Sequence, residues 1–302
     1  MADTKDTKDS LQWLREKAAA AQVAAEQKAA EAPKQMFLPG FDIGAMPNHI
    51  NRSSLFAPIA RGRRKLHHET VMVTRSDCVL EYSGQQLDEA DADLLMALIY
   101  FAHPHPLGIM VPLNRAEILR KIGRSTGKHD YDWLHKRLKA LRSAVMFLEA
   151  RKPDGTTKYK IGGMVSFNII KELAGFEEDG AEYQYMIDPR WIKMFSNREY
   201  SLMDFDRRLQ IGRGQDMAKT LQRLVATSAD PVQRYALDWL QSKMQYGGRL
   251  RDFKGALARA CSEMERLEII AAHKIETSTK GRLQLTLWLV PGAVDNILAP
   301  SG

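Results

Sequence analysis

Hydrophobic residues recur with the same kinds of spacing, in the same order, twice along the chain. In the first half, apolar residues three and four positions apart predict a helix over 88–103, a short helix over 114–122 and a longer one that begins at 125 or 126 and ends at 143. Two strands, over 145–151 and 158–170, follow on either side of a Pro-Asp-Gly turn sequence. This half therefore ends in a predicted hairpin.

The second half repeats this order with different residues. Helical spacing predicts helices over 215–227 and 249–267, and a third helix that opens at Pro231 and runs to about residue 246. Strands over 268–276 and 282–289 then flank a short polar turn. The second hairpin therefore follows its long helix just as the first one does.

This repeated order indicates the fold class and the domain organisation. A helix–turn–helix followed by a two-stranded ribbon is the winged-helix arrangement, so we expect an α+β protein with two tandem winged-helix domains, over 67–180 and 181–295. Residues 1–34 are rich in alanine but poor in large apolar groups, which predicts a helical or disordered arm. Proline and glycine punctuate 35–66, which we interpret as a linker, and 296–302 is expected to be a disordered tail.

Composition narrows the class of protein. The 302 residues include 44 lysines and arginines against 37 acids, and the net charge of +7 suits an anionic partner. No stretch approaches the roughly 18 apolar residues of a membrane span, and the polar start does not resemble a signal peptide. Two cysteines are too few for a disulfide scaffold or a four-cysteine zinc site. We expect a reduced, cytoplasmic protein with no cofactor, no metal and no membrane partner.

The predicted helix that ends at residue 143 has one apolar face and one basic face. Leu134, Leu138, Leu141 and Val145 fall on one stripe, which is expected to face the core. Nine lysines and arginines stand between residues 115 and 142, against three acids. An α-helix fits the major groove of DNA, where such cations contact phosphates and guanine edges. The alternative is an ordinary solvated helix face.

The helix over 249–267 repeats this pattern, with Phe253, Leu257, Ala260 and Met264 on its apolar stripe. Cations also surround both predicted hairpin turns, and cations at such tips commonly contact phosphate. The candidate DNA-binding residues of both helices and both hairpins are Lys128, His129, Lys136, Lys139, Ser143, Arg151, Lys152, Lys158, Arg251, Arg259, Ser262, Arg266, Lys280 and Arg282.

Several short blocks resemble a known family. They are Gln35-Met36-Phe37-Leu38, Ala45-Met46-Pro47-Asn48, Arg52-Ser53-Ser54-Leu55-Phe56, Tyr82-Ser83-Gly84 and Pro106-Leu107-Gly108. Over roughly residues 35–290 the chain resembles the TrfA family of plasmid replication initiators. The resemblance implies binding to double-stranded DNA at origin repeats called iterons, and opening of AT-rich DNA with host DnaA. It further implies recruitment of the replicative helicase and the sliding clamp, and a chain that can form a homodimer.

One of these blocks also resembles a peptide that binds the polymerase sliding clamp. Such peptides use a glutamine followed by aliphatic and aromatic anchors, here Gln35, Met36, Phe37 and Leu38. The usual ending is leucine-phenylalanine, whereas Pro39 follows Leu38 in this chain. The alternative is a hydrophobic segment that packs on its own domain.

Catalytic functions fit the sequence less well than DNA binding does. The segment 123–128 resembles a phosphate-binding loop, but it has three residues between its glycines and His129 in place of the serine or threonine. A nicking enzyme would need a histidine pair on a strand, whereas prolines flank His105. We therefore expect no enzymatic activity. A winged-helix transcriptional repressor remains an alternative, and the clamp-binding-like peptide distinguishes an initiator from it.

Overall fold

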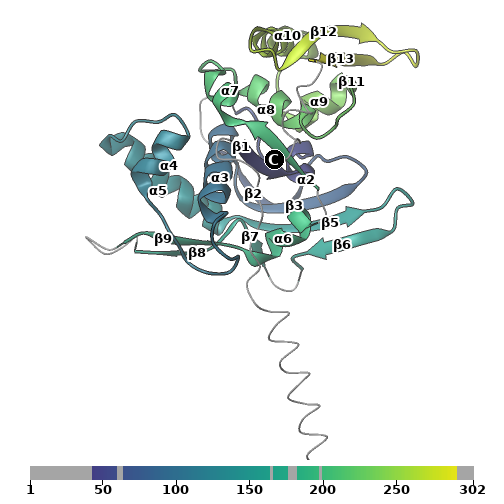
Figure 1. Ribbon diagram of the computed structural model, residues 1–302. Coiled ribbons are helices and arrows are strands. Elements are labelled where there is room, and N and C mark those ends of the chain that lie inside the picture. Colours follow the sequence, from purple (N-terminus) through teal and green to yellow (C-terminus); the bar gives the residue numbers. More distant parts are fainter. Residues whose placement is uncertain (1–42, 60–63, 164–165, 176–181, 197–198, 291–302) are drawn as a thin grey trace, which may run out of the picture. The chain divides into compact units, whose positions relative to one another are not determined.

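Helices and strands both occur along the chain in the computed structural model, with several small sheets, as expected for an α+β protein (Figure 1). The structure describes residues 43–59, 64–163, 166–175, 182–196 and 199–290. The chain divides into two units, Met1–Lys34 and Gln35–Gly302. The expected arm over 1–34, the clamp-binding-like residues 35–38 and the expected tail over 296–302 lie outside the described residues.

The first winged helix has three helices and a three-stranded antiparallel sheet. Its elements are α3 (Glu89–Ala102), β4 (Val111–Pro112), α4 (Arg115–Lys121), α5 (Lys128–Ser143), β8 (Ile170–Ala174) and β9 (Gln184–Ile187). The strands pair in the order β4-β9-β8, and α5 packs against β8. The hairpin of β8 and β9 is therefore the wing.

The second winged helix repeats this topology. Its elements are α8 (Asp216–Val225), β11 (Val232–Ala236), α9 (Leu237–Lys243), α10 (Leu250–Arg266), β12 (Ile270–Thr277) and β13 (Leu283–Leu289). The strands pair in the order β11-β13-β12, which matches β4-β9-β8 strand for strand. The prediction of two tandem winged helices is confirmed.

The first wing differs from the hairpin that the sequence predicted. The predicted hairpin exists, as β5 (Val145–Arg151) and β6 (Thr157–Ile161), but it belongs to a separate sheet. That sheet has the order β2-β3-β5-β6, with β2 (Leu66–Val71), β3 (Cys78–Gln85) and β7 (Phe167–Asn168), which pairs with β5. Figure 1 shows the β5–β6 and β8–β9 hairpins projecting to opposite sides. The predicted wing is thus part of an insertion between α5 and β8.

A second correction concerns the helix expected to open at Pro231. The chain there forms β11, with Gln233 and Tyr235 buried on alternate positions, before α9 begins at Leu237. Tyr235 pairs with Leu285 of β13 in the register of the sheet. Pairing with a strand about fifty residues later overrides the local helical spacing.

Residues 43–59 of the expected linker are part of the folded core. They contain β1 (Ile43–Pro47) and α2 (Asn48–Arg52), and β1 pairs with β10 (Tyr200–Asp204). Met46, Ile50 and Phe56 are completely buried. Pro47 is the last residue of β1, and the few apolar residues of this segment fill places in a core built by other segments.

Two hydrophobic cores divide the described chain. The first extends from Ala45 to Phe205 and the second from Ile211 to Leu289. The segment after residue 181 therefore still contributes η1 (Pro189–Trp191), α6 (Ile192–Ser196) and α7 (Phe205–Gln210) before the second core begins. Trp191 and Phe205 lie in the first core, so the cores divide the chain later than the expected boundary at 181.

Helix α3 lies at the centre of the first core and is buried on nearly all sides. Asp88 and Asp91 form a capping box at its start. Asn114 caps α4 by accepting hydrogen bonds from the backbone of Ala116 and Glu117. Within the described ranges, no helix combines the length and the apolar character needed to cross a bilayer.

Candidate nucleic-acid interface

Helix α5 presents the basic face that its sequence predicted. Leu134, Leu138 and Leu141 are completely buried, whereas the candidate residues of this helix are exposed: Lys128, His129, Lys136, Lys139 and Ser143. Val145, which the apolar stripe predicted to be buried, is exposed at the start of β5, where the sequence predicted a strand. In its winged helix α5 is the third helix, which in helix–turn–helix folds is the one positioned to enter the major groove.

Helix α10 occupies the equivalent position in the second winged helix. Phe253, Leu257, Ala260 and Met264 are completely buried, as the sequence predicted. The candidate residues on the opposite face are exposed, and they are Arg251, Arg259, Ser262 and Arg266. Arg266 is held by Glu263 at 2.8 Å and by the Gln210 carbonyl at 3.2 Å. The other three project from the helix as predicted.

The two hairpin tips differ in their chemistry. Lys280 and Arg282 are exposed at the turn between β12 and β13, which is the second wing. The segment 176–181, between β8 and β9, lies outside the described residues, and its sequence includes Glu177, Glu178 and Asp179. Among the described residues, exposed cations therefore stand at the tip of the second wing, where they can contact a DNA backbone.

The remaining candidates lie on the inserted sheet. Arg151, Lys152 and Lys158 stand at the tip of the β5–β6 hairpin, which is not the wing. Lys158 pairs with Glu199 at 2.6 Å, and Arg151 pairs with Glu149 at 3.2 Å. Two of these three cations, Arg151 and Lys158, are therefore paired with acids of the protein itself.

Three arginines that contributed to the basic character of the first helix–turn–helix have structural contacts. Arg137 is buried and donates to Asp91 at 2.5 and 2.8 Å. Arg124 lies over the Trp133 ring at 3.6 Å, and Arg115 over the Tyr183 ring at 4.0 Å. These contacts fix α4, α5 and the first wing relative to α3 and to one another.

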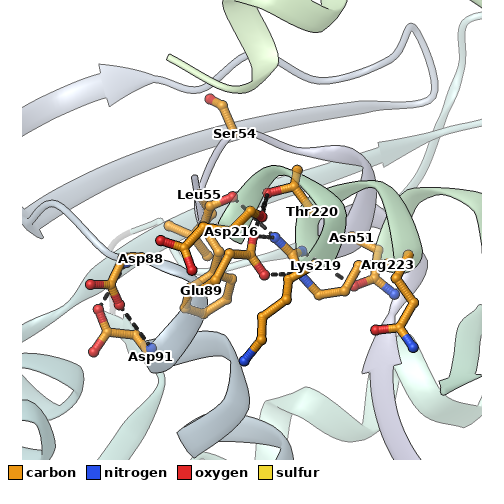
Figure 2. Close-up of polar contacts among 12 residues, drawn as sticks. Asn51, Ser54, Leu55, Asp88, Glu89, Asp91, Asp216, Lys219, Thr220 and Arg223 are labelled. Atoms are coloured by element: carbon orange, nitrogen blue, oxygen red, sulfur yellow. Dashed lines mark hydrogen bonds and ion pairs between the residues drawn. The ribbon is translucent and has the colours of Figure 1, made fainter. Parts of the chain in front are cut away.

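Buried charges join the two winged helices (Figure 2). Glu89, the first residue of α3, accepts hydrogen bonds from Arg223 at 2.5 Å, from Arg208 at 2.7 Å and from Thr220 at 2.7 Å. Asp93, one turn later, accepts from Arg208 at 2.5 Å and from Lys219 at 2.6 Å. Because α3 belongs to the first winged helix and α8 to the second, this cluster fixes the two against each other.

The environment of Glu89 explains why it stays charged. Burial by itself raises the pKa of Glu89, but the Arg223 and Arg208 guanidinium groups outweigh burial and lower this pKa to about 2. In the sequence, the signal of this cluster is the crowding of four acids at the start of α3, a position that the helix dipole also favours for anions. The cationic partners of Glu89 and Asp93 lie more than a hundred residues later.

Helix α2 and the segment after it form a second contact between the winged helices. Lys243 of α9 is completely buried and donates to the carbonyls of Asn51 at 2.8 Å and Ser53 at 2.6 Å. Gln245 donates to the Ser54 carbonyl at 2.7 Å. Burial lowers the pKa of Lys243 well below its ordinary value. One of the blocks that resembles the TrfA family, residues 52–56, thus lies at the contact between the two winged helices.

Comparisons with known proteins place the fold. No family model matches the chain, and no curated protein matches it. A crystal structure of domains 2 and 3 of RctB superposes with a TM-score of 0.52 at 14% identity, over 81% of this chain and 98% of that one. A second crystal structure of RctB domains 2–3 gives a TM-score of 0.49 at 14% identity, over 82% and 99%. At this identity the first match supports the fold alone.

Acidic, histidine and cysteine side chains do not assemble into a metal site in the described part of the chain. The segment that resembles a phosphate-binding loop joins α4 to α5, so it lacks the preceding strand of that motif. His103 and His105 lie just after the end of α3 and are not on a strand. Among the described residues, the basic faces of α5 and α10 therefore remain the candidate functional surfaces.

Proposed function

We propose that this protein is a plasmid replication initiator that binds iteron repeats in double-stranded origin DNA through both winged helices. The observation that carries the proposal is the pair of helices α5 and α10. Each is the third helix of its winged helix, each buries its apolar stripe, and each exposes a basic face. Two such helices in one chain suit a binding site read in two adjacent parts.

The contact between the winged helices supports reading of two parts at a fixed spacing. Glu89 and Asp93 bind Arg208, Lys219 and Arg223 across the contact, and the side chains of Glu89, Arg208 and Arg223 are fully buried. A rigid contact sets the distance between α5 and α10 before DNA binds. We expect this distance to select repeats with their two parts about one helical turn apart.

The initiator role beyond DNA binding rests on the family resemblance. We propose that the protein aids duplex opening together with host DnaA and recruits the replicative helicase and the sliding clamp. Residues 35–38, which lie outside the described residues, would bind the clamp through Gln35 and the apolar anchors that follow it. We propose that no nucleotide hydrolysis or strand cleavage accompanies these steps.

Footprinting on the origin of the plasmid that carries this gene tests the proposal. We expect protection of repeated sites, and a steep loss of affinity with salt. If about six to ten phosphates are neutralised, affinity falls by roughly a thousandfold or more between 50 and 200 mM salt. Unprotected repeats, or affinity that does not change with salt, would contradict binding through both helices.

The alternative of a transcriptional repressor is tested with the purified sliding clamp. A repressor needs no clamp, whereas an initiator with this peptide is expected to bind it. We expect Gln35→Ala combined with Leu38→Ala to weaken clamp binding and plasmid replication, and to leave origin binding unchanged. Equal clamp binding by wild type and double mutant would show that the resemblance to a clamp-binding peptide is misleading.

A further inference from the structure

The loop that connects the two winged helices lies beside both recognition helices. It runs from Ile211 to Gln215 between α7 and α8, and Ile211 is buried in the second core. The backbone N–H of Gly212 donates to Glu263 of α10 at 2.9 Å, and Arg266 of α10 donates to the carbonyl of Gln210 at 3.2 Å. The loop is therefore fixed against the second half of α10.

The other side of the same loop faces the start of α5. A cleft is lined by Gly212, Arg213 and Gly214 on one side and by residues 123–125 and Asp130 of the first winged helix on the other. Behind it, the α4–α5 turn approaches α7, because a Cβ at Gly123 would lie 3.2 Å from Leu209. Figure 1 shows α7 between the α4–α5 pair and α10.

Arg213 differs from the other cations of this cleft in its pairing with acids. Arg124 pairs with Asp130 at 2.9 Å, and Lys219 pairs with Asp93 at 2.6 Å. Arg213 is exposed and has no ion pair or hydrogen bond with any residue that the structure describes. Its charge is thus available to an anion outside the protein.

The neighbours of Arg213 permit close approach of a large ligand. Gly212 and Gly214 carry no side chains, and Gly214 has a φ of +82°, a conformation that favours glycine. A duplex that contacts α5 and α10 in adjacent major-groove segments presents its phosphate backbone to whatever lies between the two helices. In this protein that position is occupied by the loop.

We infer that Arg213 binds a DNA phosphate between the two major-groove contacts. The inference rests on the proposed function and deepens it, because it adds a contact from the connection between the domains to those from the domains themselves. A phosphate contact at this point fixes the position of the duplex along the protein without reading a base.

The test compares Arg213→Ala and Arg213→Lys with wild type in titrations of a duplex containing the origin repeats, at several salt concentrations. For Arg213→Ala we expect weaker binding to all sequences alike, and a slope of log affinity against log salt that is smaller by about 0.9. Arg213→Lys should keep most of the affinity, because lysine also binds phosphate as a point charge. Both variants should unfold like wild type.

Arg234→Ala is the matched control, since Arg234 is an exposed arginine on β11 outside the cleft. Unchanged affinity and slope in Arg213→Ala, with normal wild-type binding, would overturn this inference alone. Loss of affinity only on one spacer sequence, without rescue by lysine, would overturn the phosphate assignment. Absence of wild-type binding to any duplex would instead overturn the proposed function.

Discussion

Arg223 of α8 donates two hydrogen bonds to Glu89 of α3, at 2.5 and 3.1 Å, although 134 positions separate them in the chain. Both side chains are buried, at 0% and 1% exposure. Arg223 also donates to the Phe56 carbonyl at 3.1 Å, so one guanidinium links α3, α8 and the segment after α2. This pair therefore stands at the centre of the contact between the winged helices.

Removing the carboxylate of Glu89 should destabilise the protein strongly. In Glu89→Ala, Arg223 and Arg208 would keep their charges in a buried site without their shared partner. Breaking a buried ion pair in this way costs about 3–5 kcal/mol, which chemical denaturation would measure. Glu172→Ala, at an exposed position on β8, should change the free energy of unfolding by no more than about 0.5 kcal/mol. Similar values for the two variants would contradict the role given to Glu89.

The lowered pKa of Glu89 predicts that the free energy of unfolding depends on pH in the acidic range. The pKa of Glu89 lies at about 2 in the folded protein, below its ordinary value of 4.5. A lowered pKa of a carboxyl group contributes stability that is present above about pH 4.5 and is lost as pH falls toward 2. The contribution is of the order of 3 kcal/mol.

Denaturation of wild type and Glu89→Gln across this pH range isolates the contribution. Glutamine cannot ionise, so the difference in the free energy of unfolding between the two proteins should shrink as pH falls from 4.5 to 2. A difference that stays constant with pH would mean that another group causes the loss of stability in acid.

Two neighbouring cations on α5 should behave in opposite ways. Lys136 is exposed, so Lys136→Ala should weaken DNA binding and leave the free energy of unfolding unchanged. A lost guanine contact would cost about 1–3 kcal/mol at one base pair, and Lys139→Ala is expected to act similarly. Arg137 is buried against Asp91, so Arg137→Ala should destabilise the fold. DNA titration and thermal unfolding of each variant would separate the two effects.

The first wing depends on one glycine at the end of β8. Gly175 has a φ of +78°, and a Cβ there would lie 2.3 Å from the backbone oxygen of Glu182. Gly175→Ala should therefore displace the hairpin and destabilise the protein by more than the roughly 1–2 kcal/mol expected for a positive φ alone. Gly155→Ala is the control, since its φ is +84° and the space around it is open. Equal losses of stability in the two variants would mean that the hairpin adapts.

The sequence alone predicted the helices α5 and α10 and which of their faces are buried. Leu134 and Leu138 in α5, and Phe253 and Leu257 in α10, were placed correctly because helical geometry rotates each residue by about 100° whatever surrounds the helix. Local capping was predictable for the same reason, as at Asn114, where the contacts span three residues.

Local sequence patterns could not predict which strands pair with each other. The turn sequence near Pro153 correctly predicted a hairpin, but only the tertiary structure decided that β8 and β9, and not β5 and β6, complete the first winged helix. A hairpin makes the same hydrogen bonds between its own two strands whichever sheet it belongs to, so the choice of sheet depends on which surfaces pack together. The strand at Val232–Ala236 was missed because its partner is β13.

The same distinction applies to the charged residues. The amino-acid sequence showed a basic protein with two basic helices. It could not distinguish cations that face solvent from cations that face acids. Arg137, Arg208 and Arg223 look like surface residues in the sequence and are buried in the fold. Their partners Glu89 and Asp91 lie from 46 to 134 positions away. An ion pair depends on distance in space, and only the packing of α3 against α8 and α5 brings these groups together.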